Sequence, residues 1–198
     1  MAERDPETSF WRYEMRPVDM IHEPDVVQET ATGYMDLMAF KRTSFRFQSC
    51  QRYRVGGVEK AAFETFKQTG VYELAQDDPR LLRQRTQLSG GRVLQRVQLV
   101  VPPLSDYLRF AFVYFDHFAR AGEDLRILDV SKMDSDGLPN HDFVLLDDEI
   151  VIKFRHSSED GSVIGRELMT NADLARFRGY RDRALELAVP FGEYQERG

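Results

Sequence analysis

The sequence lacks the features that mark secreted, disulfide-bonded and membrane proteins. Cys50 is its single cysteine, which excludes an internal disulfide and a zinc cluster built from several thiolates. No apolar run has the length that spans a bilayer, and the opening residues, MAERDPETSF, contain no basic start followed by an apolar stretch. We therefore expect a cytoplasmic protein that does not associate with a membrane.

Familiar catalytic motifs are lacking as well. There is no GxxxxGK[ST] loop, and neither Gly56-Gly57 nor Gly90-Gly91 has the further spacing of a nucleotide-binding loop. There is no GxSxG or HExxH motif, and the four histidines contain no i, i+4 pair for a metal. These absences predict no catalytic residue, no cofactor and no metal, and they favour a protein that is not an enzyme.

What the chain does have is a large apolar content and an uneven distribution of charge. Its hydrophobic content of 42%, with 14 Phe and 8 Tyr, is sufficient for the core of one domain. Residues 1–36 carry nine acids and three bases, 37–121 carry seven and fourteen, and 122–149 carry nine and two. Such alternation is typical of an acidic extension that packs on a basic body, of two binding surfaces of opposite sign, or of solvated faces. We interpret residues 1–43 as an acidic, partly ordered extension and 44–198 as a single α/β domain.

Hydrophobic periodicity predicts strands mixed with helices. A short helix is expected across Val26–Phe40 and a strand-like piece across Ser9–Met15. Strands are expected at 44–55, 92–101, 125–130, 143–146, 150–156 and 163–168. A turn at Asp147–Glu149 joins the strands at 143–146 and 150–156, and a turn at Ser157–Ser162 joins those at 150–156 and 163–168. Helices are expected at 58–69, 79–88, from Ser105 to about Arg120, and from a cap at Thr170 or Asn171 to Pro190. This order predicts an α/β (α+β) fold with a mixed, largely antiparallel sheet and helices packed on it.

The helix that contains FAFVYF (110–115) is apolar almost all round. One stripe consists of Leu104, Tyr107, Leu108, Ala111, Phe115 and Phe118, and a second of Phe110, Val113, Tyr114 and His117, with Phe112 outside both. We interpret it as a buried central helix. The second stripe could be covered by the protein's own core, by the N-terminal extension or by a second copy of the chain.

Two groups of residues are candidates for binding. A ligand or partner surface is predicted from Asp106, Tyr107 and Arg109 near the start of the aromatic helix, together with Asp142, Asp147 and His156. The acids of the hairpin turns could bind a divalent cation, but acids are also common simply because turns favour them. Arg80, Arg83, Arg85, Arg92 and Arg96 form a basic patch with no acid between residues 80 and 96, which could contact nucleic acid or an acidic protein.

The sequence resembles an uncharacterised family of small actinobacterial cytoplasmic proteins, many of them encoded beside helix-turn-helix regulators. The matching stretches lie within residues 44–194 and include SFRFQSCQRYRV, PLSDYLRF, AGEDLRIL and NHDFVLLDD. The resemblance implies a regulatory or accessory role and supplies no catalytic residues. From DFVLLDD through the last helix, the chain also resembles half of a phospholipase D-like sensor domain without its catalytic motif, since Ser158 stands where that motif has a lysine.

Together these observations predict a non-catalytic regulatory or adaptor protein that binds a partner protein, such as a transcription regulator, or a small ligand. One alternative is a divergent phosphodiesterase or nucleotide-processing enzyme that uses His156. Another is a nucleic-acid-binding protein that uses the Arg80–Arg96 patch.

Overall fold

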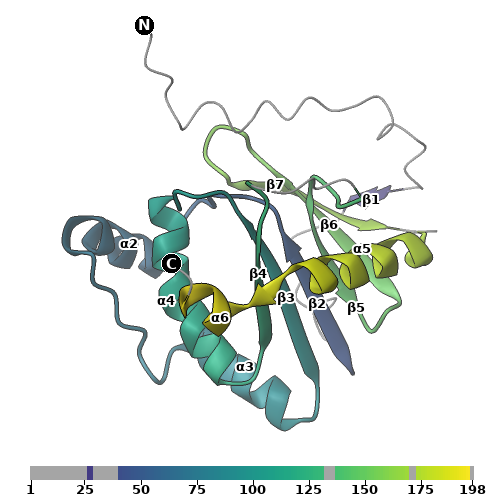
Figure 1. The fold of residues 1–198 in the computed structure, drawn as a ribbon, viewed down its shortest axis with the longest axis horizontal. Helices are drawn as coiled ribbons and strands as arrows, with labels where there is room; N and C mark the ends of the chain where they lie inside the picture. Colours follow the sequence, from purple (N-terminus) through teal and green to yellow (C-terminus); the bar gives the residue numbers. More distant parts are fainter. Residues whose placement is uncertain (1–25, 29–39, 132–136, 170–172, 197–198) are drawn as a thin grey trace, which may run out of the picture.

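An eight-stranded mixed sheet forms the centre of the computed structural model, which describes residues 26–28, 40–131, 137–169 and 173–196 (Figure 1). The strands are β1 (Val26–Gln28), β2 (Thr43–Gln48), β3 (Val93–Val100), β4 (Asp124–Asp129), β5 (Asp142–Leu146), β6 (Ile150–His156), β7 (Val163–Met169) and β8 (Val189–Pro190). Their spatial order is β1-β7-β6-β5-β2-β3-β4-β8. β2, β3 and β4 run parallel, and the other neighbouring pairs are antiparallel. The predicted fold class is confirmed.

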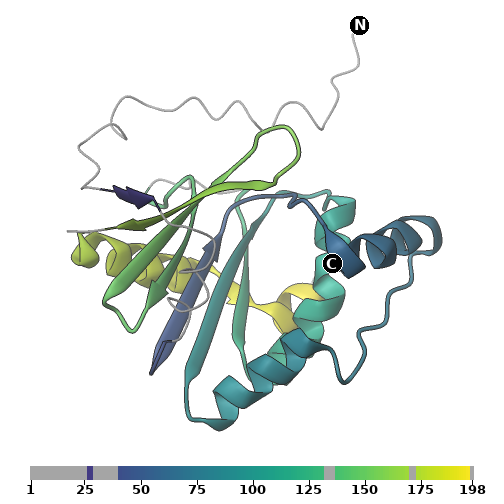
Figure 2. The same cartoon turned by 180° about the vertical axis from the view of Figure 1, so that it is seen from behind.

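Helices cover both faces of this sheet. They are α2 (Gly57–Thr69), α3 (Pro79–Ser89), α4 (Asp106–Arg120), α5 (Leu174–Leu187) and α6 (Phe191–Glu196). Successive strand residues point to opposite faces. Val97 and Leu99 pack with α5, whereas Val100 packs in a second core with α3 and α4. Figure 1 accordingly shows α5 crossing the sheet, and the view from behind in Figure 2 places it beyond the strands.

Local sequence signals set most element ends as predicted. Gly70 adopts the left-handed conformation (φ 70°) that ends α2, and its N–H donates to the carbonyl of Phe66. Ser105 caps α4 by accepting the N–H of Leu108. Pro79 opens α3 after the cap Asp78, whose side chain accepts the N–H of Arg80. These ends depend on a few neighbouring residues, which is why the sequence alone predicts them.

Several predicted elements are wrong in extent or type. The first predicted strand ends at Gln48 rather than at residue 55, because the Gln98 side chain donates to the carbonyls of Gln48 and Cys50 and the chain leaves the sheet there. Val26–Gln28 is a strand paired with β7, not the start of a helix. Residues 29–39 of that predicted helix, and Ser9–Met15, lie outside the described residues.

The C-terminal end also differs from the prediction. The last long helix is capped by Asp173, whose side chain accepts the N–H of Arg176, whereas the predicted caps at 170 and 171 lie outside the described residues. That helix ends at Leu187, and Pro190 belongs to β8, which pairs with β4. The helix α6 that follows was not predicted, because six residues are too few to show a clear period.

The aromatic helix α4 is buried, as predicted, and its cover comes from other elements of the described chain. Phe110 contacts Phe63 and Phe66 of α2 as well as Tyr72, with ring centroids 5.2, 5.5 and 4.5 Å apart. Phe112, which belongs to neither stripe, contacts Phe191 and Tyr194 of α6. Helix α3 and strand β4 also pack on α4, and Leu81, Leu125 and Ile127 belong to the same core. Within the described residues, no helix has both the length and the hydropathy to span a bilayer.

Candidate functional site

The structure separates the six predicted binding residues into three places. Asp106 and Arg109 lie on the exposed first turn of α4, where they form an ion pair with each other. Asp147 follows the last residue of β5 and Asp142 is its first, so the two carboxylates stand at opposite ends of that strand. Tyr107, Asp142 and His156 converge, as described below. The six residues therefore do not line a single site.

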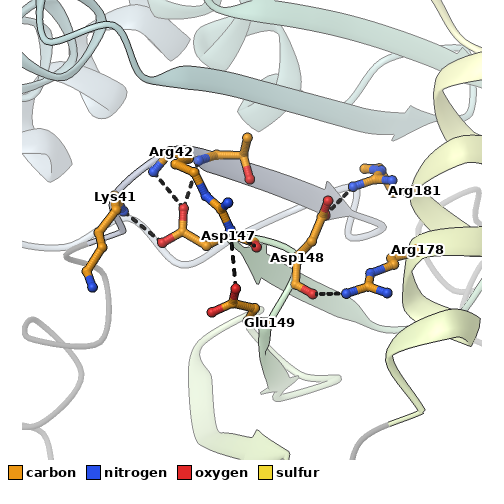
Figure 3. Close-up of polar contacts among 8 residues, drawn as sticks. Lys41, Arg42, Asp147, Asp148, Glu149, Arg178 and Arg181 are labelled. Carbon is orange, nitrogen blue, oxygen red and sulfur yellow. Dashed lines mark hydrogen bonds and ion pairs between the residues drawn. The ribbon is translucent and has the colours of Figure 1, made fainter.

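The Asp147 side chain stabilises the turn between β5 and β6 (Figure 3). Its carboxylate accepts the backbone N–H groups of Lys41, Arg42 and Thr43 at 2.8, 2.6 and 2.9 Å. Burial opposes ionisation of this carboxyl, but the three donors outweigh it and hold the pKa of Asp147 below its ordinary value. Its oxygens are thus used within the fold.

The rest of this turn is held from the other side by helix α5. Arg178 donates to the carbonyl of Asp148, and Arg181 forms an ion pair with the Asp148 carboxylate, as Figure 3 shows. Arg42 pairs with Glu149 at 3.2 Å. Each of the three acids of this predicted cation-binding turn therefore has a basic or backbone partner, which explains the acidic cluster without a metal.

A buried polar cluster lies at the carboxyl end of β2. We call it the buried cluster and define it as Cys50, Tyr53, Asp142 and His156. Asp142 is 5% exposed, and its Oδ1 accepts both the N–H and the hydroxyl of Ser49 at 2.7 Å. Its Oδ2 accepts the Tyr53 hydroxyl at 2.5 Å and lies 3.9 Å from His156 Nε2. The Tyr53 ring lies between those of Tyr107 and His156, with centroid distances of 5.4 and 5.1 Å.

Cys50 completes this cluster from the segment after β2, not from within a strand as its sequence context had indicated. Its thiol, an Asp142 oxygen and a His156 ring nitrogen all lie within 4.8 Å of one another. Burial, followed by the negative charge of Asp142, raises the pKa of Cys50 to about 12. The free thiol is therefore protonated at neutral pH and is a poor nucleophile.

The five predicted basic-patch residues do not form one continuous basic surface. Arg96 is 7% exposed and pairs with Glu123 at 2.8 Å, and Arg80 pairs with Glu59 and Asp78. Arg85 contacts Gln76, and Arg92 lies over the ring of Phe40. Arg83 is exposed, and within the described residues it makes no hydrogen bond or ion pair. Three of the five, Arg80, Arg83 and Arg96, instead line a cavity, whereas Arg85 and Arg92 lie outside its lining.

This arginine cavity, of about 250 Å³, lies where β2 and β3 meet α3 and α4. Arg46, Arg80, Arg83 and Arg96 contribute four guanidinium groups to its lining, against the two carboxylates of Glu59 and Glu123. Tyr114 and Phe118 form an aromatic part of the wall. The Arg80 and Arg96 guanidinium groups lie over these rings, 5.3 Å from the Tyr114 centroid and 5.6 Å from that of Phe118.

Buried hydrogen-bonding groups also line the cavity. Gln84 is 6% exposed, and its Nε2 donates to Glu123 Oε2 at 2.5 Å. Gln84 Oε1 and the hydroxyl of Ser44, which is 1% exposed, have no hydrogen-bond partner among the described residues. Buried polar groups are normally paired, so these two atoms mark a wall suited to a polar occupant.

Sequence reasoning missed several of these residues. Ser44 lies on β2, Gln84 on α3 and Glu123 just before β4, and they carry no motif, so nothing in their local spacing connects them. Ser49 and Tyr53 lie within the strand predicted at 44–55, and their polar role appears only because the chain leaves the sheet after Gln48. A signal was available for Arg96, because an arginine in the middle of an apolar alternation requires a buried acidic partner.

Fold and site together define an α/β protein with a mixed sheet, an arginine-lined cavity beside α3 and α4, and a buried polar cluster at the carboxyl end of β2. The chain belongs to the family described as a domain of unknown function (DUF6879), whose model matches residues 34–196. No curated protein matches its sequence.

Proposed function

We propose that this protein is a non-catalytic regulatory or adaptor protein that binds a small anionic ligand in the arginine cavity. The observation that carries the proposal is the charge of the cavity wall. Its four guanidinium groups outnumber its two carboxylates, which are paired with Arg80 and Arg96, and Arg83 makes no ion pair among the described residues. A concave wall with an excess of one sign concentrates ions of the opposite sign.

The cavity also limits the chemistry of the ligand. Its volume of about 250 Å³ lies just below the usual range for small-molecule sites, so it favours a compact metabolite over a dinucleotide. Guanidinium groups bind carboxylates and phosphates through paired N–H donors. Gln84 Oε1 accepts hydrogen bonds, so we expect the ligand to carry an N–H or O–H donor beside its anionic group. A small organic carboxylate or a phosphate monoester has these properties.

The regulatory part of the proposal is supported by the resemblance noted from the sequence. Small actinobacterial cytoplasmic proteins encoded beside helix-turn-helix regulators are suitable partners for such regulators. We therefore propose that the ligand controls association with a transcription regulator in the cytoplasm. Co-purification of this chain with a helix-turn-helix regulator, in the presence and absence of ligand, tests this part separately.

Thermal unfolding of the full chain with inorganic phosphate, nucleoside monophosphates, di- and tricarboxylates and amino acids tests the ligand proposal. A ligand that binds the folded state raises the unfolding midpoint, and calorimetry then gives its Kd. Phosphate-bearing and carboxylate-bearing compounds form separate arms, which distinguish the two anion chemistries.

The matched variants are Arg83→Ala and Arg85→Ala, two residues apart on α3. Arg83 lines the cavity, whereas Arg85 contacts Gln76 outside it. Loss of charge-assisted hydrogen bonds costs about 1.5–3 kcal/mol, so we expect Arg83→Ala to weaken binding about 10- to 100-fold and Arg85→Ala to leave it nearly unchanged. Equal effects of the two substitutions, or no stabilising compound in any arm, would contradict the proposal.

The alternative functions have less support from the geometry. His156 is enclosed by Tyr53 and Phe154, so its ring is poorly placed to attack a phosphodiester. Arg96 is buried, and Arg80 is engaged by two acids, which leaves fewer exposed cations for a nucleic-acid backbone. Hydrolysis of a phosphodiester, or binding of nucleic acid that Arg85→Ala weakens, would favour these alternatives.

A further inference from the structure

The buried cluster brings together three side chains whose ligand atoms are sulfur, oxygen and nitrogen. Cys50 follows β2, Asp142 begins β5 and His156 ends β6. Their ligand atoms lie within 4.8 Å of one another, in a part of the protein where Asp142 is 5% exposed and the His156 side chain 8%. This juxtaposition is unrelated to the arginine cavity and is not explained by the proposed function.

The Asp142 carboxylate is oriented in the way that a metal-binding carboxylate is oriented. Both donors of Ser49 bind its Oδ1, and the Tyr53 hydroxyl donates to its Oδ2, so the plane of the carboxylate is fixed with Oδ2 3.9 Å from His156 Nε2. Outer hydrogen bonds of this kind commonly orient the ligands of metal sites. The 3.9 Å from Oδ2 to His156 Nε2 is too long for a hydrogen bond. This distance is nearer to the separation of about 3.3–3.5 Å between two ligand atoms of one tetrahedral zinc ion than to the length of a hydrogen bond.

The surroundings hold the other two ligands in place. The His156 ring is contacted by the edge of Tyr53 and lies parallel to Phe154, at centroid distances of 5.1 and 6.4 Å. Gln98 Nε2 donates to the Cys50 carbonyl at 3.0 Å and so fixes the backbone beside the thiol. The carboxyl end of a parallel strand is also the usual position of ligand sites in α/β sheets.

We propose that Cys50 Sγ, Asp142 Oδ2 and His156 Nε2 bind a single zinc ion. A thiolate, an imidazole and a carboxylate form a donor set that suits zinc, and three protein ligands leave a fourth position for a water molecule. Binding replaces the thiol proton of Cys50 with the metal, and the proton is released to solvent. The ion would join the ends of β2, β5 and β6 and thereby stabilise the fold.

Metal analysis and cobalt substitution of the full chain test this proposal. We expect about one zinc per chain after purification without chelator, and a rise in the unfolding midpoint when zinc is returned to chelator-treated protein. Cobalt in the same site should give a sulfur-to-cobalt charge-transfer band, which reports the Cys50 thiolate directly and requires no variant. Absence of stoichiometric metal, or a cobalt complex without that band, would overturn the proposal.

Variants then assign the ligands. Cys50→Ser and His156→Gln should each weaken zinc binding by more than about tenfold, and Ser49→Ala by about tenfold through loss of one donor to Asp142. His117→Gln, which changes a histidine of α4 outside the cluster, is the matched control and should bind like the wild type. Zinc affinity that is unchanged in a folded Cys50→Ser protein, as judged by circular dichroism, would also overturn the proposal.

Discussion

At the scale of single residues, the turn between β5 and β6 shows how acids can be structural rather than functional. Asp147 and Asp148 both adopt positive φ, 52° and 61°, which fits the tight hairpin turn that the sequence predicts. Asp tolerates this conformation better than most residues. The Asp147 side chain additionally accepts three backbone N–H groups that would otherwise lack partners. Its carboxylate therefore joins the segment at residues 41–43 to the hairpin through hydrogen bonds.

The substitution Asp147→Asn tests this role. Asn also tolerates positive φ, so the change removes the charge and one acceptor oxygen while the turn is retained. We expect a loss of about 1–2 kcal/mol in the free energy of unfolding at pH 7, measured by denaturant titration, since the carboxylate is partly exposed. Asp148→Asn, in which φ is also positive, is the control and should cost less, because Asp148 accepts no backbone N–H in the described chain.

Comparison of the wild type with Asp147→Asn also predicts a pH dependence of stability. The pKa of Asp147 is lower in the folded protein than its ordinary value near 3.8, so its contribution is complete above that value. It is lost as the pH falls through the lower folded pKa. The stability difference between the wild type and Asp147→Asn should therefore shrink below about pH 4. A difference that is constant down to pH 2 would contradict the role of the charge.

At the scale of elements, α4 is apolar nearly all round because α2, α3, α6 and the sheet share its surface. α2 and Tyr72 cover Phe110, the sheet covers the buried stripe, and the short helix α6 covers Phe112 and Phe115 through Phe191. Phe191 is 2% exposed, although only seven residues of the sequence follow it. The last helix is thus part of the core and not a loose tail.

Phe191→Ala tests this assignment of α6. Truncation of a fully buried phenylalanine costs about 3–5 kcal/mol, and we expect a loss in this range together with increased binding of a hydrophobic dye. Phe191→Leu retains most of the volume and should cost much less. A loss below about 1 kcal/mol for the alanine variant would show that α6 does not cover α4.

At the scale of the whole molecule, the two candidate sites lie at opposite ends of β2. Ser44 and Arg46 line the arginine cavity, whereas Ser49 and Cys50 enter the buried cluster. The Arg96–Glu123 pair supports the cavity wall, because Arg96 lies on β3, Glu123 immediately precedes β4, and Gln84 of α3 also contacts Glu123. Removal of either charge leaves the other buried without a partner of opposite charge.

A double-mutant cycle on Arg96 and Glu123 measures this coupling. We expect Arg96→Met and Glu123→Gln each to cost about 3–5 kcal/mol, because each leaves one unpaired buried charge. The double variant should be more stable than the sum of the two losses predicts. Additive losses measured by denaturant titration would show that the two side chains do not depend on each other.

The sequence by itself determined the helices α2, α3 and α4, the six longer strands in approximate extent, and the hairpin turns. Each of these depends on the periodicity and capping of residues that are close along the chain. The covers of α4 could not be predicted, because Phe63, Phe110 and Phe191 meet through long-range packing.

Both candidate sites were decided by the tertiary structure. Ser44, Gln84 and Glu123 meet at one wall, and Cys50, Asp142 and His156 meet at one strand end, although each set is spread over about eighty or more residues of sequence. The sequence predicts one surface that contains Asp142 and His156, and the two side chains do lie close together, since consecutive antiparallel strands place the start of one beside the end of the next. Cys50 joins them because β2 pairs with β5, and that pairing follows from burial of the whole sheet rather than from any local pattern.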